Sequence, residues 1–221
     1  WARNPSTAAS TPLWWVPPLN LFLVGHVYRT AKRELQLECA KAECNVMRKE
    51  SEICKTKYPI LLVHGIFFRD WQFFNYWGRI PAELIRNGAT IFYGKQQSAQ
   101  SISVSAKELA AQIQSVIAET GAEKVNIIAH SKGGLDCRCA MQEYGAAKYV
   151  ASLTTINTPH HGCAFVDDLL QKVPAGVARW IAAKYNRLFT KLGDQNPDFL
   201  AGVRELTAEN CQKFHTEHPP I

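Results

Sequence analysis

The chain has 221 residues, of which 47% are hydrophobic and 20% are charged. This length and apolar content are enough to bury one substantial core, and they favour a single main domain over several. The net charge of +6 is compatible with contact to an anionic surface. The basic residues are scattered and form no recognised nucleic-acid motif, so nucleic acid is not among the expected partners.

The first 57 residues are expected to form an N-terminal apolar segment and linker, separate from the main domain. Residues 1–12 are polar and small and are expected to be disordered. The apolar stretch from Leu13 to Arg29 contains Pro17-Pro18 and is shorter than the roughly 20 residues that a membrane span needs. It is interpreted either as a helix packed on the domain or as the remnant of a membrane anchor. In the second case three aromatic residues would lie at the interface: Trp14, Trp15 and Tyr28.

From Tyr58 the pattern changes to short apolar runs separated by helical patterns. Four runs have the length and composition of strands: YPILLV (58–63), ATIFYG (89–94), KVNIIA (124–129) and VASLTTI (150–156). A capping box, Ser105-x-x-Glu108, predicts the start of a helix that ends at Thr120-Gly121, and a second helix is expected from Ser131 to Tyr144. Strands that alternate with helices indicate an α/β fold with a mostly parallel sheet and helices on both faces.

The cysteines are odd in number, so at least one has no disulfide partner within the chain. They do not form the two closely spaced pairs that mark a zinc site. Free thiols are favoured, with one N-terminal bridge as the alternative in an oxidising compartment. The seven residues are Cys39, Cys44, Cys54, Cys137, Cys139, Cys163 and Cys211.

The stretch NIIAHSKGG, residues 126–134, places a serine where a strand turns into a helix. Such a turn strains the serine backbone, so the residues two positions away must be small, and Ala129 and Gly133 meet this need. The hydroxyl of Ser131 would then project above the carboxyl end of the strands, with a helix N-terminus behind it to stabilise a developing oxyanion. The alternative is an ordinary serine at a helix N-cap.

Three motifs carry a family resemblance: YPILLVHGI, NIIAHSKGGLDCR and LTTINTPHHG. In this order they resemble the bacterial triacylglycerol lipases of the α/β-hydrolase superfamily. The resemblance implies an α/β-hydrolase domain over residues 58–221, with Ser131 as the nucleophile. The other implied site residues are Ile66 and Lys132, whose backbone N–H groups would form the oxyanion hole, and His64 and Gly65, which would shape its loop.

In this family the acid and the histidine of the triad follow the serine, each after a further strand. Neither strand is found before Ile221, so both partners are expected beyond it, and the domain is expected to be C-terminally truncated. The last residues, His218-Pro219-Pro220-Ile221, are interpreted as a loop that leads to another element, which agrees with this expectation. The 221 residues alone would then be hydrolytically inactive. A compressed triad that pairs Asp194 with His215 is the alternative.

A helical insertion over residues 163–214 corresponds to the lid region of the resembled family. Its apolar residues fall at helical spacing along one stripe, and basic residues lie largely off that stripe. The two interpretations are a mobile lid that meets a lipid surface and a helix docked permanently on the core. The stripe comprises Val177, Trp180, Ile181, Tyr185, Leu188, Phe189 and Leu192.

These features imply a serine carboxylester hydrolase, a lipase or esterase that cleaves acyl-glycerol or related lipid esters through an acyl-enzyme on Ser131. No organic cofactor is needed, and no metal is expected, because the segment that binds calcium in some relatives is absent. The expected setting is a membrane-associated or secreted bacterial protein that contacts a membrane surface, with its oligomeric state left open. The alternatives are an acyltransferase or thioesterase with the same elbow, and a non-catalytic hydrolase-like protein that binds lipid or other proteins.

Overall fold

The computed structural model describes residues 17–66, 76–191 and 193–219. The chain divides into two compact units, Trp1–Ile53 and Cys54–Ile221. The disorder expected for residues 1–12 lies outside the described residues, as do Trp14 and Trp15. In the part of the chain that the structure describes, no helix combines the length and the apolar character that crossing a membrane requires.

The first unit contains one long helix, α2 (Pro17–Ser51), of 35 residues. Proline suits the first turn of a helix, because the N–H that it lacks has no helical partner there, so Pro17-Pro18 begin α2. The helix continues through the charged residues after Arg29 as far as Ser51. Apolar side chains such as Tyr28 and Leu35 are exposed along α2.

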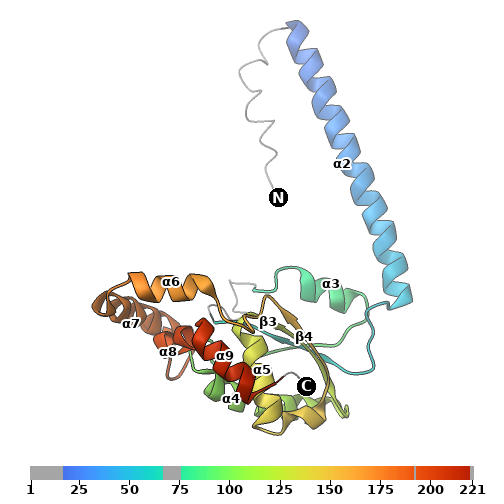
Figure 1. Cartoon of the computed structure of the whole chain (residues 1–221). Helices are drawn as coiled ribbons and strands as arrows, with labels where there is room; N and C mark the ends of the chain where they lie inside the picture. Colours follow the sequence, from blue (N-terminus) through green and yellow to red (C-terminus); the bar gives the residue numbers. More distant parts are fainter. Residues whose placement is uncertain (1–16, 67–75, 192, 220–221) are drawn as a thin grey trace. The chain divides into compact units, whose positions relative to one another are not determined.

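The second unit is built on a parallel sheet, whose strands are β1 (Ile60–Val63), β2 (Ile91–Tyr93), β3 (Val125–His130) and β4 (Val150–Ile156). The strand order is β2-β1-β3-β4, so β1 and β3 lie at the centre. Figure 1 shows β3 beside β4 at one side of this sheet. The four expected strands and their parallel pairing are confirmed. Val63 is in register with Ala129, so the loop after β1 starts beside the turn after β3.

Helices cover both faces of this sheet. They are α3 (Ile80–Arg86), α4 (Ile102–Thr120), α5 (Lys132–Gln142) and the short 3-10 helix η2 (Ala146–Tyr149). Because side chains alternate along a strand, Leu61 and Val63 pack against residues of α4 and α5, whereas Leu62 packs with Trp77 on the opposite face. The expected end of α4 is confirmed at Gly121, which has a φ of +67°.

The start of α4 differs from the expected capping box at Ser105-x-x-Glu108. The N-cap is Ser101, whose hydroxyl accepts a hydrogen bond from the N–H of Val104 at 3.4 Å. Ser105 is buried and donates to the carbonyl of Gln97 at 3.0 Å. The capping-box prediction was wrong because a tertiary contact takes up the hydroxyl that the local pattern assigned to the helix end.

After β4 the described residues form four helices: α6 (Ala164–Lys172), α7 (Ala175–Lys191), α8 (Phe199–Arg204) and α9 (Ala208–Glu217). The apolar stripe expected on α7 is divided between two environments. Phe189 is 2% exposed and its ring centroid lies 6.1 Å from that of Phe199, whereas Trp180 is 62% exposed. Leu192 lies outside the described residues. The C-terminal half of α7 is therefore docked on the core, and its N-terminal half presents apolar side chains at the surface.

Candidate active site

Ser131 lies between β3 and α5 in a backbone conformation that residues with side chains rarely adopt. Its φ is 54° and its ψ is −132°. Its N–H donates to the carbonyl of Ile156 at 2.9 Å, and its carbonyl accepts from the N–H of Gly134 at 3.1 Å. Such a strained strand-to-helix turn is what a nucleophile elbow requires. The alternative, an ordinary N-cap, requires a side-chain capping bond, which Ser131 does not make.

Three glycines leave the room that this turn needs. A Cβ at Gly133 would come within 3.0 Å of the backbone carbonyl of His64, and a Cβ at Gly65 would come within 3.0 Å of Ser131 Cβ. At Gly134 the added Cβ would meet the side chain of Thr158 equally closely. The loop after β1, the elbow and the loop after β4 therefore approach one another so closely that side chains are excluded between them.

The two backbone amides expected to form an oxyanion hole are both available. Among the described residues, neither the N–H of Ile66 nor that of Lys132 donates a hydrogen bond to a protein acceptor. Both residues are buried. Buried amides without an acceptor cost free energy, and such donors are suited to a negative charge that develops during a reaction.

Tyr76, which sequence reasoning missed, joins the loop after β1 to the elbow. Its hydroxyl accepts a hydrogen bond from the N–H of Gly65 at 3.1 Å and shares a short one with Nδ1 of His130. Burial lowers the pKa of His130 and so favours its neutral imidazole. Its Nδ1 is engaged with Tyr76, so this nitrogen is not directed at Ser131 as a base. Nothing in the sequence distinguishes Tyr76 from the other tyrosines.

The side chain of Lys132 is buried at the first turn of α5. Its Nζ donates to Oδ1 of Asp136 at 2.7 Å and to Oγ of Ser105 at 3.2 Å. The Lys132 and Asp136 side chains are 1% and 3% exposed. Burial raises the pKa of Asp136 to about 7, although the charge of Lys132 opposes that shift. Lysine and aspartate at i and i+4 of an expected helix are a sequence signal for this pair.

The hydroxyl of Ser131 has no hydrogen-bond partner among the described residues. His160, in the turn after β4, is engaged elsewhere: its Nδ1 lies 3.0 Å from Arg138 and its Nε2 lies 3.2 Å from the hydroxyl of Thr155. Among the described residues, therefore, no histidine is hydrogen-bonded to the Ser131 hydroxyl as a catalytic base would be.

The alternative triad of Asp194 and His215 is not formed. Asp194 is buried and accepts hydrogen bonds from the N–H groups of Ser98 and Ala99, at 3.2 and 3.0 Å. The ring of His215 lies beside that of His161, with centroids 4.9 Å apart. Asp194 instead fastens the segment after α7 to the loop after β2, which is a structural role.

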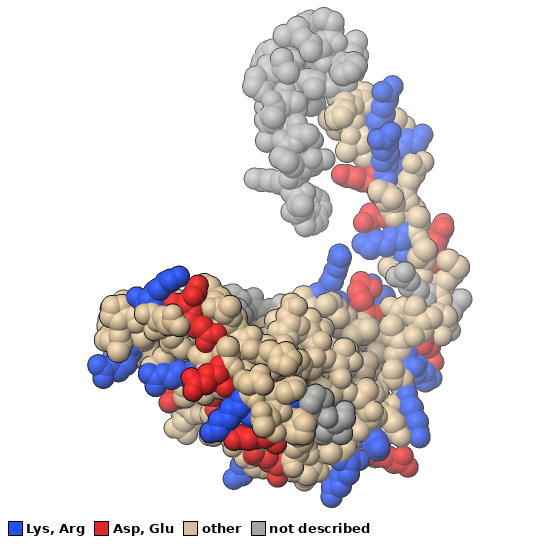
Figure 2. All heavy atoms as spheres, in the orientation of Figure 1, with Lys and Arg blue, Asp and Glu red and all other residues tan. Residues whose placement is uncertain are grey.

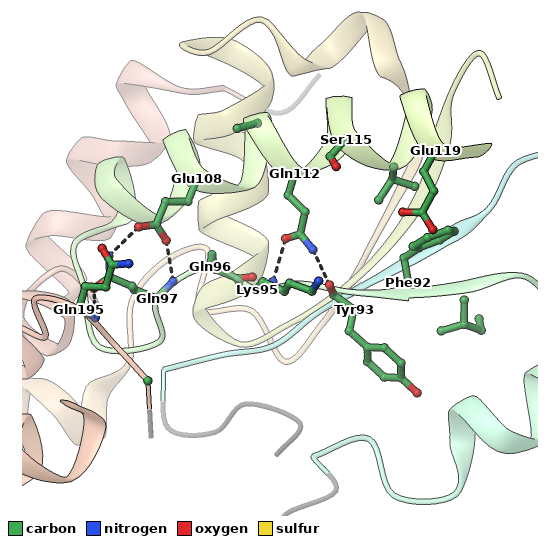
Figure 3. A pocket seen from close by; sticks show the side chains of 14 residues that line it. Phe92, Tyr93, Lys95, Gln96, Gln97, Glu108, Gln112, Ser115, Glu119 and Gln195 are labelled. Atoms are coloured by element: carbon green, nitrogen blue, oxygen red, sulfur yellow. Dashed lines mark hydrogen bonds between the residues drawn. The ribbon is translucent and has the colours of Figure 1, made fainter. Parts of the chain in front are cut away.

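A groove of about 720 Å³ lies beside β2 and α4, and neither Ser131 nor Ile66 lines it (Figure 3). Gln112 accepts a hydrogen bond from the N–H of Lys95 at 2.8 Å and donates to the carbonyl of Tyr93 at 2.5 Å. These bonds fasten the segment after β2 to α4 and occupy polar groups of the lining. The groove is thus part of the scaffold that supports the loop after β2.

The sequence profile of the palmitoyl protein thioesterase family matches residues 59–199. The chain belongs to this family. It is 35% identical, over 177 residues, to a triacylglycerol lipase of Pseudarthrobacter phenanthrenivorans and to one of Burkholderia plantarii. Each match covers 74% of this chain, and the matches cover 54% of the first relative and 49% of the second. A triacylglycerol lipase of Vibrio cholerae is 34% identical over 75% of this chain and 55% of its own length. The chain thus spans about half the length of these curated relatives.

A solved structure agrees with the fold. The mature form of a Bacillus licheniformis lipase matches with a TM-score of 0.57 and 24% identity, over 73% of this chain and 59% of that one. This likeness and the parallel sheet confirm the expected α/β-hydrolase fold. The relatives confirm the resemblance to bacterial triacylglycerol lipases.

Proposed function

We propose that the protein is a serine carboxylester hydrolase of the lipase type, with Ser131 as its nucleophile. The observation that carries the proposal is the backbone of Ser131, which has a positive φ at a strand-to-helix turn although its side chain makes no capping hydrogen bond. The hydroxyl has no partner among the described residues and so is available to react. Relatives named triacylglycerol lipase support lipid esters as the substrate class.

In the proposed reaction Ser131 Oγ attacks the ester carbonyl carbon while a general base removes its proton. The carbonyl oxygen becomes an oxyanion, which accepts hydrogen bonds from the N–H groups of Ile66 and Lys132. Each such donor contributes about 3 kcal/mol of transition-state stabilisation. The base then protonates the departing alcohol, and water attacks the acyl-enzyme to release the acid and restore the serine. The base and its acid partner are proposed to come from outside residues 1–221.

The hydrolase domain is proposed to span residues 58–221, with the insertion over 163–214 in contact with the lipid surface. The exposed apolar side chains of α6 and α7 include Phe165 and Trp180, and Nζ of Lys184 lies 5.5 Å from the centre of the Trp180 ring. Aromatic anchors with a neighbouring cation suit a membrane interface. Positive and negative side chains are interspersed on the visible face, so apolar contact is the driving force we propose (Figure 2).

Active-site labelling tests the assignment of the nucleophile. A fluorophosphonate probe should label the protein expressed from its full reading frame, and Ser131→Ala should abolish the labelling. Ser152→Ala is the matched control, because that hydroxyl lies at the exposed surface of β4 and donates to Asn126 at 2.8 Å. Labelling that persists in Ser131→Ala would overturn the assignment.

A thioesterase is the second candidate, because the matched family is described as palmitoyl protein thioesterase. The same acyl-enzyme serves both reactions, which differ in the leaving group. Relatives 34–35% identical are named triacylglycerol lipases, so we favour oxygen esters. Measuring kcat/KM for an oxygen ester and a thioester of the same acyl chain distinguishes the two functions. The value should be higher for the oxygen ester, and a higher value for the thioester would favour the thioesterase.

A further inference from the structure

Three side chains of metal-ligand type converge where the ends of α5 and α9 meet, apart from the serine turn. Cys139 lies on α5, Glu143 is the residue that caps α5, and His218 is the residue that caps α9. One potential ligand atom of each side chain lies within 4.8 Å of the other two. Cysteine and glutamate at i and i+4 share one face of the helix, as helical metal-ligand pairs do.

The orientation of His218 makes its Nε2 the ligand atom. Its Nδ1 lies 3.2 Å from the backbone carbonyl of Phe214, and its ring stacks on that of Phe214 with centroids 4.3 Å apart. An Nδ1–H donated to that carbonyl fixes the tautomer and turns the Nε2 lone pair outward, an arrangement common among metal-bound histidines. That Nε2 lies 2.7 Å from Oε1 of Glu143. A lone pair and a carboxylate oxygen this close need a positive species between them, either a proton or a metal ion.

The donor set and its surroundings favour one class of ion. Sulfur, imidazole nitrogen and carboxylate oxygen together match Zn²⁺, whereas Ca²⁺ and Mg²⁺ prefer oxygen alone. Cys139 is 2% exposed, while the Glu143 side chain is 46% exposed. A pocket of about 320 Å³, lined by all three side chains and by Glu217, connects the cluster to solvent. An ion therefore has an entry path, and a water molecule has room to complete a tetrahedron.

We propose that Cys139, Glu143 and His218 bind Zn²⁺, with water as the fourth ligand. Sγ of Cys139 already lies 3.5 Å from Oε2 of Glu143, so small side-chain rotations bring the three atoms onto one ion. Binding releases two protons to solvent, that of the thiol and the one between His218 and Glu143, and replaces the hydrogen bonds of Glu143 to Cys139 and His218 with bonds from the three side chains to the metal. The ion would clamp the end of α9 onto α5, the helix that begins at Lys132. This site departs from the expectation that no metal binds.

Cobalt binding to the full chain under reducing conditions tests the proposal. Co²⁺ occupies zinc sites, and its bond to a thiolate produces a charge-transfer absorption that the other ligands do not. After removal of metal with a chelator, we expect one equivalent of Co²⁺ to produce that absorption and one equivalent of Zn²⁺ to abolish it. Cys139→Ser should eliminate the absorption, and Glu143→Gln should weaken binding by about tenfold or more. Glu143 is half-exposed, so this second variant tests the site even if Cys139→Ser fails to fold.

The matched control is the double variant Cys39→Ser/Cys44→Ser, which removes two exposed thiols of α2 and should leave the absorption unchanged. Loss of the absorption in this control would assign the metal to α2 and overturn the proposal. Absence of the absorption in the unmodified chain, or equal binding by Glu143→Gln, would also overturn it. In that case the positive species between His218 and Glu143 is a proton, and the cluster is a structural ion pair.

Discussion

At the residue scale, the conformation of Ser131 depends on neighbours that have no side chain. A Cβ at Gly133 would meet the carbonyl of His64, a backbone atom that cannot rotate away as a side chain can. Any added atom at this position must therefore displace either the loop after β1 or the first turn of α5. The elbow and the proposed oxyanion loop would separate, because His64 and Ile66 belong to that same loop.

Gly133→Ala should therefore destabilise the fold by about 1–3 kcal/mol, the usual cost of overpacking a close-packed site. Urea denaturation measures the change. Gly176→Ala is the matched control: it lies on α7 with no atom within 4 Å of an added Cβ, and it should be neutral or slightly stabilising. Equal stability of the two variants would show that the contact between the loop and the elbow is looser than the structure indicates.

Asp136 carries a second residue-scale prediction, on the pH dependence of stability. Burial raises its pKa in the folded state to about 7, from 3.8 in the unfolded chain. Between these values the folded state binds more protons than the unfolded state, so the contribution of Asp136 to stability is fully present below about pH 4 and is lost as pH rises to 7. This loss amounts to at most about 1.4 kcal/mol per pH unit. Asp136→Asn mimics the protonated form and should not show it.

Free energies of unfolding at pH 5 and pH 8 provide the measurement. Asp136→Asn should match the unmodified protein more closely at pH 5 and exceed it in stability at pH 8. Asp168→Asn is the control, because its i, i+4 partner Lys172 is also exposed and the pair should contribute little at either pH. Severe destabilisation by Asp136→Asn at pH 8 would show that the attraction of Lys132 outweighs the cost of burial.

Prediction from sequence reached some of these residues and missed others, for physical reasons. Ser131, Gly133 and Lys132 lie in one short motif, so local pattern was enough to single them out. Asp136 follows at helical spacing and was within reach of the same reasoning. Tyr76 acts only through contacts with Gly65 and His130, which the fold brings together. A local sequence pattern does not predict such a contact.

At the element scale, α7 shows what hydrophobic periodicity does and does not determine. The spacing of apolar residues correctly predicted a helix, because one face must be apolar for a helix to pack. It did not determine which part of that face meets the core. Phe189 stacks with Tyr185 and Phe199, whereas Trp180 has no such aromatic partner among the described residues and is exposed. Tyr185 belongs to the same stripe, but Phe199 begins α8, after the loop that follows α7, and so lies beyond the range of the periodic pattern.

Substitutions of these two residues should separate docking from lipid contact. Phe189→Ala should destabilise the protein by about 3–5 kcal/mol, because it leaves a cavity in the core. Trp180→Ala should change stability by less than about 0.5 kcal/mol but weaken binding to phosphatidylcholine vesicles, measured by co-sedimentation. Ile85→Ala, at an exposed apolar site on α3, is the control and should bind vesicles as the unmodified protein does. Equal vesicle binding by Trp180→Ala and Ile85→Ala would remove the support for α7 as the lipid-contacting element.

At the scale of the whole molecule, the alternation of strands and helices made the hydrolase fold predictable. The central strand β1 is buried on both faces and has a continuous apolar sequence, whereas the edge strand β4 is largely exposed; all four strands were found because each is a short run rich in β-branched and other apolar residues. Contacts between residues distant in sequence were not predictable. Cys139 and His218 come together only because α9 packs against the end of α5, and neither helix pattern specifies that neighbour.

The two units of the chain should differ strongly in hydrogen exchange. Amides of β1 and β3 lie in the centre of the sheet, with strands on both sides, and should exchange only when the second unit unfolds as a whole. α2 buries few of its described side chains, and a helix without a packed face is only marginally stable in water. Its amides should therefore exchange faster than those of β3 by a factor on the order of 100 or more, as mass spectrometry of peptic peptides can show. Protection of α2 equal to that of β3 would mean that its exposed residues, Tyr28 and Leu35 among them, are covered by a partner. If that protection falls on dilution, the partner is a second copy of the chain.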